Sequence, residues 1–140
     1  MSLQIVAESP ARWDADKQRI IAGAARGIFD SRYSQRATGD LLPGDWFRAE
    51  AGGKVVGYGW LDVVWGDAEI LLATDATAQS AGVGTALLER LGDEANARGL
   101  SYLYNVIRAT HPRSTELARW LEKRGFVAGE DGRLVRATKR

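Results

Sequence analysis

The sequence predicts an α/β (α+β) fold in which a mixed, mostly antiparallel central sheet carries helices on both faces. Two-residue turn signals divide a β-rich stretch between residues 46 and 74 into three strands, which predicts an antiparallel meander. Two segments with helical apolar spacing, 83–98 and 112–124, flank a strand-like segment at 100–107. The 140 residues suit a single domain that spans residues 1–140.

The N-terminal third predicts one strand, one helix and a loop. Residues 3–7 form the strand, which ends at Ser9-Pro10. Apolar residues between Ile20 and Phe29 trace one stripe of a helix. The polar stretch 31–45 contains two glycines and a proline and predicts a loop. The meander strands then follow at 46–51, 54–65 and 68–74, with Gly52-Gly53 and Gly66-Asp67 as their turns.

The C-terminal half changes to a helical period. Val83, Leu87, Leu91 and Ala95 recur every four residues on a helix that ends at Arg98-Gly99. The strand 100–107 is almost continuously apolar, which predicts burial on both of its faces. The second helix turns Leu117, Trp120 and Leu121 inward, and a hairpin of 126–127 with 134–137 closes the chain.

Composition excludes several classes of function. The chain has no cysteine and one histidine, His111, so it has neither disulfides nor a thiolate or imidazole cluster for a metal. A net charge of +1 does not favour nucleic acid or an anionic membrane as the main partner. No apolar run approaches the roughly 20 residues of a membrane span, and the N-terminus does not resemble a secretory signal. We therefore expect a cytoplasmic enzyme or binding domain.

The passage from the third meander strand into the following helix carries the chemistry. A helix N-terminus leaves about four backbone N–H groups without helical partners, and the helix dipole adds positive charge there. Gly82 and Gly84 let a diphosphate approach the main chain closely, and the Thr85 hydroxyl adds a donor. A Walker loop is excluded, because the single Gly-Lys pair, Gly53-Lys54, precedes a valine. A dinucleotide fingerprint is excluded because Leu87 stands where a third glycine is required.

Two motifs at the expected separation suggest a family. The first is Gln79-Ser80-Ala81-Gly82-Val83-Gly84, preceded by Leu72-x-Thr74-x-Ala76, and the second is Trp120-Leu121-Glu122-Lys123-Arg124-Gly125-Phe126. Together with the order of elements over essentially the whole chain, they resemble the GNAT superfamily of acyl-CoA-dependent N-acetyltransferases.

The resemblance implies that acetyl-CoA is the co-substrate, and the composition predicts that no metal takes part. The resemblance also implies a cofactor site made of the loop residues Gln79, Ser80, Ala81, Gly82, Val83, Gly84 and Thr85 for the pyrophosphate, Leu72, Ala73 and Thr74 for the pantetheine arm, and Ser114. The strands 68–74 and 100–107 are expected to splay apart, which leaves a slot where the thioester meets the amine.

The chain departs from the family pattern at several positions. Ser80 replaces a usual glycine and Ala76 a usual proline. Leu121 stands where a tyrosine often protonates the departing thiolate, and Ser114 falls near a usual asparagine. Cofactor binding is therefore better supported by the sequence than any particular acid.

The catalytic candidates are Glu69, Tyr104 and Asn105. Glu69 opens the strand that leads to the cofactor loop and is our first choice for the base, the alternative being a solvent-facing carboxylate at a strand end. Tyr104 and Asn105 point to opposite faces of their strand, so one of them is expected to face the cleft. Tyr104 is either the replacement acid or a core aromatic. His111, near the expected path of the pantetheine, is either a catalytic residue or an exposed loop or capping residue. Ser114 either hydrogen-bonds the cofactor or caps the helix.

These features predict an N-acetyltransferase that transfers acetyl from acetyl-CoA directly to a primary amine, because no cysteine is available for an acyl-enzyme. The acceptor is a small-molecule amine or a protein amine. Two alternatives remain: a coenzyme A-binding sensor or interaction module without turnover, and a loop that binds another diphosphate. The resemblance also leaves a homodimer open.

Overall fold

The computed structural model describes residues 3–24, 27–29, 33, 35–78, 82–129 and 132–138. In these residues seven strands form one sheet in the order β1-β2-β3-β4-β5-β7-β6. The strands are β1 (Leu3–Glu8), β2 (Asp45–Ala51), β3 (Lys54–Val64), β4 (Asp67–Thr74), β5 (Tyr102–Val106), β6 (Val127–Ala128) and β7 (Arg133–Ala137). Neighbouring strands run antiparallel except β4 and β5, which are parallel.

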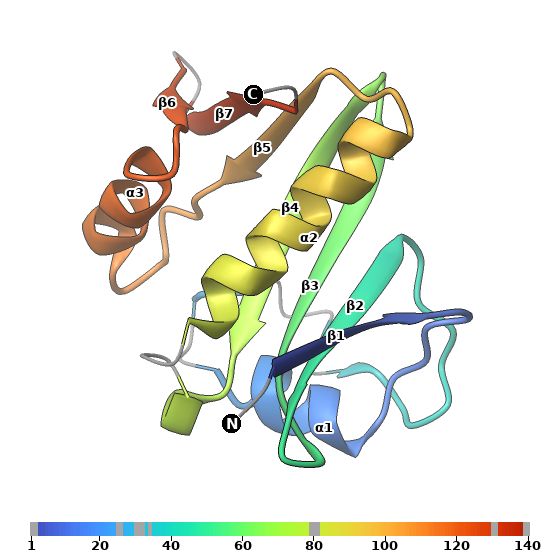
Figure 1. Ribbon diagram of the computed structural model, residues 1–140. Helices are drawn as coiled ribbons and strands as arrows, with labels where there is room; N and C mark the ends of the chain where they lie inside the picture. Colours follow the sequence, from blue (N-terminus) through green and yellow to red (C-terminus); the bar gives the residue numbers. More distant parts are fainter. Residues whose placement is uncertain are drawn as a thin grey trace.

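Helices lie on both faces of this sheet, which confirms the predicted fold class. Helix α2 (Val83–Ala97) crosses one face along β3 and β4, and α3 (Ser114–Glu122) lies beside β5 and β7 (Figure 1). The short α1 (Ala15–Lys17) continues into a π-helical turn, η1 (Gln18–Ala22), and both pack on the opposite face. A 3₁₀ turn, η3 (Ala76–Ala78), follows β4. None of the helices in the described part of the chain is long and apolar enough to cross a membrane.

Alternation along β3 separates two apolar cores. Gly57 and Gly59 face α2, and a Cβ on Gly57 would lie 2.8 Å from Val83 Cγ1. The absence of these side chains lets α2 pack directly on the strand. Tyr58 and Trp60 point the other way and are fully buried with the aromatic residues of the N-terminal segment. Period-two alternation therefore determines which helix covers which face.

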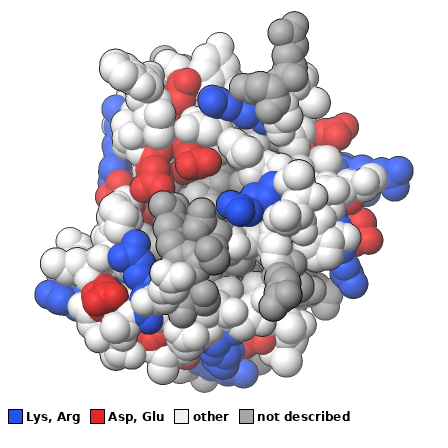
Figure 2. All heavy atoms as spheres, turned by 180° about the vertical axis from the view of Figure 1, so that it is seen from behind, with Lys and Arg blue, Asp and Glu red and all other residues white. Residues whose placement is uncertain are grey.

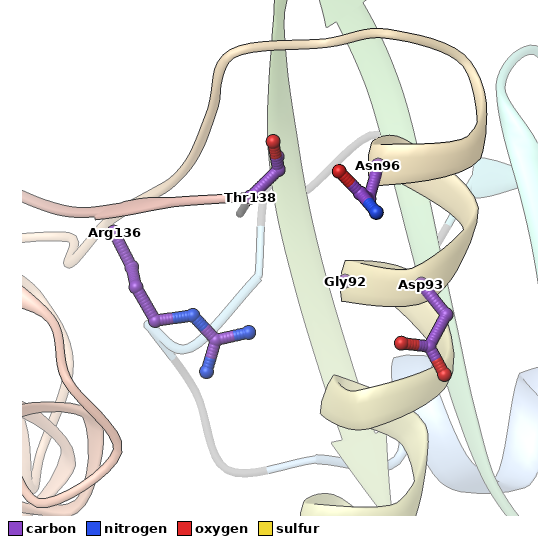
Figure 3. A pocket seen from close by; sticks show the side chains of 5 residues that line it. All are labelled: Gly92, Asp93, Asn96, Arg136 and Thr138. Carbon is purple, nitrogen blue, oxygen red and sulfur yellow. The ribbon is translucent and has the colours of Figure 1, made fainter. Parts of the chain in front are cut away.

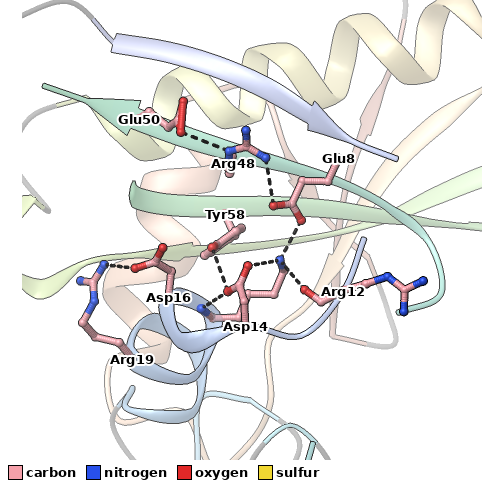
Figure 4. A network of polar contacts seen from close by, with 9 residues as sticks. Glu8, Arg12, Asp14, Asp16, Arg19, Arg48, Glu50 and Tyr58 are labelled. Carbon is pink, nitrogen blue, oxygen red and sulfur yellow. Dashed lines mark hydrogen bonds and ion pairs between the residues drawn. The ribbon is translucent and has the colours of Figure 1, made fainter. Parts of the chain in front are cut away.

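A buried charge anchors the N-terminal segment to the sheet (Figure 4). The Lys17 side chain is 0% exposed, and its Nζ lies 2.7 Å from Glu8 Oε1 and 3.2 Å from Asp14 Oδ2. It also donates to the Arg12 carbonyl at 2.8 Å and lies 4.7 Å from the centre of the Tyr58 ring. Two hydrogen bonds of the ammonium and its ion pair with Glu8 accommodate the charge inside the fold.

Two predictions about individual elements are wrong. The helix expected to run to Phe29 ends at Ala22, and Phe29 instead packs 5.8 Å from the Trp60 ring as part of a bend. The apolar spacing of the segment that ends at Phe29 therefore reflects packing of a loop onto the aromatic core. The strand 100–107 is shorter, Tyr102–Val106, and is not buried on both faces, since Tyr102 and Val106 are exposed. The meander and the closing hairpin are confirmed.

Candidate active site

Strands β4 and β5 separate after a short stretch of pairing. Only Ala68 with Leu103 and Glu69 with Tyr104 lie opposite each other, whereas β4 pairs with β3 as far as Thr74. Within the described residues, no strand therefore pairs with the second edge of β4 beyond Glu69. The Asn105 side chain bridges the start of this gap by donating from Nδ2 to the Ile70 carbonyl at 2.8 Å.

The open edge of β4 presents main-chain groups in a regular order. The Ile70 carbonyl points toward β5, since it accepts the Asn105 amide. The Asp75 N–H points toward β3, where it donates to the Val56 carbonyl at 2.8 Å. Because main-chain directions alternate along a strand, the N–H and C=O groups of Leu72 and Thr74 face the open edge. This edge can accept an extended ligand in the way that a sheet accepts a further strand.

The edge leads directly to the N-terminus of α2. Gly82 caps this helix in the left-handed conformation, with φ of 78°, and a Cβ placed on it would meet nothing within 4 Å. The first helical hydrogen bond runs from Ala86 N–H to the Gly82 carbonyl, so the N–H groups of residues 83–85 precede the helical ladder. A Cβ on Gly84 would lie 3.9 Å from Thr74 Oγ1, which brings the strand end beside the helix start.

Asp75 fixes the turn between β4 and α2. Its Oδ1 accepts the Thr77 N–H at 3.0 Å and the Thr77 hydroxyl at 2.9 Å, and its Oδ2 pairs with Arg19 of η1. These hydrogen bonds, led by the Thr77 N–H, lower the pKa of Asp75 below its usual value. Sequence reasoning missed Asp75 and Arg19, although an aspartate two residues before a threonine is the pattern of an Asx turn.

On the face opposite α2, Tyr104 lies among charged groups. Glu69 is its partner across the strands, and the Arg133 guanidinium carbon lies 4.9 Å from the centre of its ring. Burial raises the pKa of the Tyr104 phenol, and the negative charges of Glu69, Asp67 and Asp62 raise it further, against the opposing effect of Arg133. Figure 2 shows this face, where the largest group of acidic side chains lies above and to the left of the centre. The phenol is therefore held in its protonated form at neutral pH.

Two hollows lie near β7, one beside α3 and the other beside α2. One, of about 450 Å³, separates α3 from the closing hairpin and is lined by Arg108, Ser114, Thr115, Ala118, Glu122 and Arg133 among others. The other, of about 190 Å³, lies toward the C-terminal end of α2 and is lined by Gly92, Asp93, Asn96, Arg136 and Thr138 (Figure 3). The second hollow is far along the helix from Gly82, so it does not belong to the open edge.

Sequence comparison identifies the family. The description "acetyltransferase (GNAT) domain" belongs to a family model that matches residues 43–128, a range that includes the open edge and the start of α2. The chain belongs to the GNAT family. This confirms the resemblance on which the expected cofactor site was based.

Solved GNAT structures share this fold. The ribosomal-protein-S18-alanine N-acetyltransferase from Escherichia coli is 21% identical, with a TM-score of 0.68 over 99% of this chain and 96% of its own. N-acetylglutamate synthase from Neisseria gonorrhoeae, complexed with coenzyme A and N-acetyl-glutamate, is 22% identical, with a TM-score of 0.71 over 98% of this chain and 36% of its own. A putative GNAT acetyltransferase from Desulfovibrio desulfuricans has a TM-score of 0.71 at 14% identity over 96% of both chains. No curated protein sequence matches the chain.

The structure brings most of the expected GNAT site residues together at one end of β4 and α2. These are Leu72, Ala73, Thr74, Gly82, Val83, Gly84 and Thr85. Gln79, Ser80 and Ala81 lie outside the described residues. Ser114 is the first residue of α3 and lines the groove beside the hairpin, and the N-cap is Arg113, so Ser114 does not cap this helix.

The structure also gives the surroundings of three further predicted residues, His111, Asn105 and Tyr104. The His111 Nδ1 accepts the Arg113 N–H at 2.9 Å, which agrees with the capping interpretation, and burial lowers its pKa. Asn105 faces the gap, whereas Tyr104 is 8% exposed and largely covered. Sequence reasoning also missed Arg124, whose guanidinium reaches Thr85 at the start of α2.

Proposed function

We propose that this GNAT protein is an N-acetyltransferase that transfers acetyl from acetyl-CoA directly to a primary amine. The observation that carries the proposal is the open edge of β4, which presents the main chain of Leu72 and Thr74 and leads to the N–H groups of the first turn of α2. An extended thioester with a diphosphate at one end suits a strand edge that leads to the positively polarised N-terminus of a helix. The proposal treats residues 1–140 as one domain.

The cofactor would occupy the edge and the helix start together. The pantetheine amides would pair with the main chain of Leu72 and Thr74. The diphosphate would accept hydrogen bonds from the N–H groups of residues 83–85, and the preceding residues 79–81 would complete the loop. The left-handed Gly82 supports this placement, because the space that its missing Cβ leaves is empty.

Residues at the mouth of the gap supply the chemistry of transfer. Glu69 removes a proton from the acceptor ammonium, directly or through water, and the neutral amine attacks the thioester carbonyl. Main-chain N–H groups of β4 stabilise the oxyanion of the tetrahedral intermediate. When this intermediate collapses, the C–S bond breaks and the thiolate takes a proton, for which Tyr104 is our candidate donor. Asn105, whose buried Oδ1 has no hydrogen-bond partner among the described residues, would orient the amine or a water.

The acceptor in this proposal is a small-molecule amine or a protein amine. The GNAT structures similar in fold include an enzyme named for ribosomal protein S18 and a synthase of N-acetylglutamate, so the shared fold accommodates both classes.

One observation favours a second function, a coenzyme A-binding module without turnover. Leu121, which occupies the position where relatives often carry a tyrosine acid, is 1% exposed and packs in the core. It therefore has neither a proton to donate nor access to a thiolate. This second function requires tight cofactor binding with no release of thiol.

Calorimetry with acetyl-CoA and thiol release with a panel of amines test the proposal. Binding with turnover supports transfer, binding without turnover supports the module, and absence of binding by folded protein contradicts both. Parallel lines in double-reciprocal plots against acetyl-CoA would contradict direct transfer.

Two glycines offer a matched pair for this test. Gly82 and Gly99 bracket the same helix with φ of +78° and +75°, and a Cβ on either meets nothing within 4 Å. Gly82→Leu and Gly99→Leu should each lose about 1–2 kcal/mol of stability from left-handed strain. Only Gly82→Leu should raise the KM for acetyl-CoA, by about ten-fold or more, because it removes close access to the main chain. An equal KM for the two variants would contradict the assignment of the diphosphate site.

A further inference from the structure

Arg124 places a fixed positive charge against the first turn of α2. Its Nη2 and Nε donate to Thr85 Oγ1 at 2.9 and 3.3 Å, and its Nη1 donates to the Trp120 carbonyl at 2.9 Å. The guanidinium carbon also lies 3.9 Å from the centre of a Trp120 ring. Three hydrogen bonds and one aromatic face therefore define where this cation lies.

The backbone of Arg124 and the Trp120 ring against which its guanidinium lies are held in place as well. Its carbonyl accepts from Arg136 Nη1 at 3.0 Å, which ties the end of α3 to β7. The Trp120 ring packs on the start of α2, since a Cβ on Gly84 would lie 3.3 Å from Trp120 Cζ2. Gly84, Trp120 and Arg124 thus form one packed unit beside the helix start, and a longer residue at position 84 would displace it.

This location is electrostatically unfavourable for a cation in the absence of a ligand. The N-terminus of a helix carries positive partial charge, which favours anions and disfavours cations. The first turn of α2 contains no acidic residue, and no side chain caps Gly82. The arginine, the N–H groups of the first helical turn and the dipole therefore all favour a negative charge in the same place, so an anion that binds there relieves their mutual repulsion.

The hydrogen bonds to Thr85 also determine what its hydroxyl can do. A hydroxyl has two acceptor positions and one proton. Arg124 Nε and Nη2 both donate to Thr85 Oγ1, and a guanidinium has no acceptor, so the Thr85 proton must point to a different partner and the hydroxyl acts as a donor there. Charge-assisted hydrogen bonds of this kind are stronger than neutral ones, and they hold the hydroxyl in one orientation.

We propose that Arg124 is a positioning residue for the diphosphate of the cofactor, which it serves by orienting the Thr85 hydroxyl as a donor and by offsetting the diphosphate charge. This inference rests on the proposed acetyl-CoA site and adds a residue from outside its loop. It explains why the position before Gly125 in the closing motif carries an arginine whose side chain turns back to α2.

Three thioesters test the proposal: acetyl-CoA, acetyl-3′-dephospho-CoA, which retains the diphosphate, and acetyl-pantetheine, which lacks it. Arg124→Gln should raise the KM for the first two by about 10–100-fold with kcat nearly unchanged. It should leave the kcat/KM for acetyl-pantetheine unchanged. Arg124→Lys, which keeps the charge without the paired donors, should recover part of the loss.

Arg119→Gln is the matched control, because Arg119 lies on α3, the helix that precedes Arg124, and has an exposed side chain. It should leave all three KM values unchanged. In a double-mutant cycle, Thr85→Val and Arg124→Gln should be strongly non-additive for acetyl-CoA, since one residue acts through the other.

Other outcomes overturn the inference. If Arg124 is only structural, Arg124→Gln would lower kcat/KM equally for all three thioesters. The effects of Thr85→Val and Arg124→Gln would then add in the double variant. A loss confined to acetyl-CoA would assign Arg124 to the 3′-phosphate instead. Wild-type protein that binds no acetyl-CoA would refute the proposed function itself, whereas normal wild-type kinetics with an unaffected Arg124→Gln variant would refute this inference alone.

Discussion

Glu69 and Tyr104 form the last residue pair between β4 and β5 before the two strands separate. Their neighbours Ala68 and Leu103 are fully buried under α2, so alternation directs both side chains to the opposite face. The carboxylate and the phenol therefore lie together where the gap begins. This arrangement combines an acceptor of protons with a donor of protons at one position of the fold.

Glu69→Gln should lower kcat by about 10²–10⁴-fold, because the amide cannot accept the proton of the acceptor ammonium. Calorimetric affinity for acetyl-CoA should stay within two-fold of the wild type, since Glu69 lies outside the diphosphate site. Glu116→Gln, at an exposed position on α3, provides the control and should match the wild type. Unchanged kcat in Glu69→Gln would remove this residue from the mechanism.

Tyr104 should ionise above the ordinary phenol pKa of 10.0, owing first to burial and then to the charge of Glu69. The difference in tyrosinate absorbance between wild type and Tyr104→Phe measures this titration. Because the folded pKa exceeds the unfolded pKa, the protonated phenol contributes stability fully below pH 10. That contribution is lost as the pH rises through the folded pKa. Ionisation below pH 10 in the difference spectrum would contradict the expected surroundings of this phenol.

His111 should titrate below the ordinary histidine pKa of 6.5, because burial disfavours its charged form. It is the only histidine of the chain, so its imidazole proton resonances are assigned without ambiguity in an NMR titration. Because the pKa is lower in the folded state, the neutral His111 imidazole contributes stability above pH 6.5. That contribution is lost as the pH falls through the pKa of the folded state. Protonation also removes the Nδ1 acceptor of the Arg113 N–H. His111→Ala should abolish this pH dependence of stability, and a midpoint above 6.5 would refute the prediction.

Lys17→Met should destabilise the fold by about 3 kcal/mol in urea unfolding, because it leaves Glu8 buried without its closest cation. Adding Glu8→Gln should restore part of this loss by removing the uncompensated charge. Lys54→Met is the control, since Lys54 is 61% exposed and lies 3.9 Å from Asp75, and it should change stability by less than about 0.5 kcal/mol. A loss in Lys17→Met no larger than in the control would show that the buried network contributes little.

The sequence predicted the elements whose signals are local. Turn glycines at positions 52–53 and 66 and period-two alternation defined the meander, and the four-residue spacing from Val83 to Ala95 defined α2. The helix expected to reach Phe29 was wrong because an aromatic core assembled from distant residues holds that segment as a bend. Apolar spacing indicates that a side chain is buried, but it does not show whether the segment that carries it is a helix or a loop packed on the core.

The residues of the candidate site divide in the same way. The glycines at the start of α2 followed from the sequence, because a single strand-to-helix connection contains them, and the family resemblance implied the open strand edge before them. The pairing of Glu69 with Tyr104, the bond from Asn105 to Ile70 and the contact of Arg124 with Thr85 depended on the tertiary structure. These contacts join residues that lie 35 to 39 positions apart, and the sheet order and the packing of α3 bring them together. Local backbone preferences are encoded over a few residues, whereas the meeting of distant side chains depends on how the whole core packs.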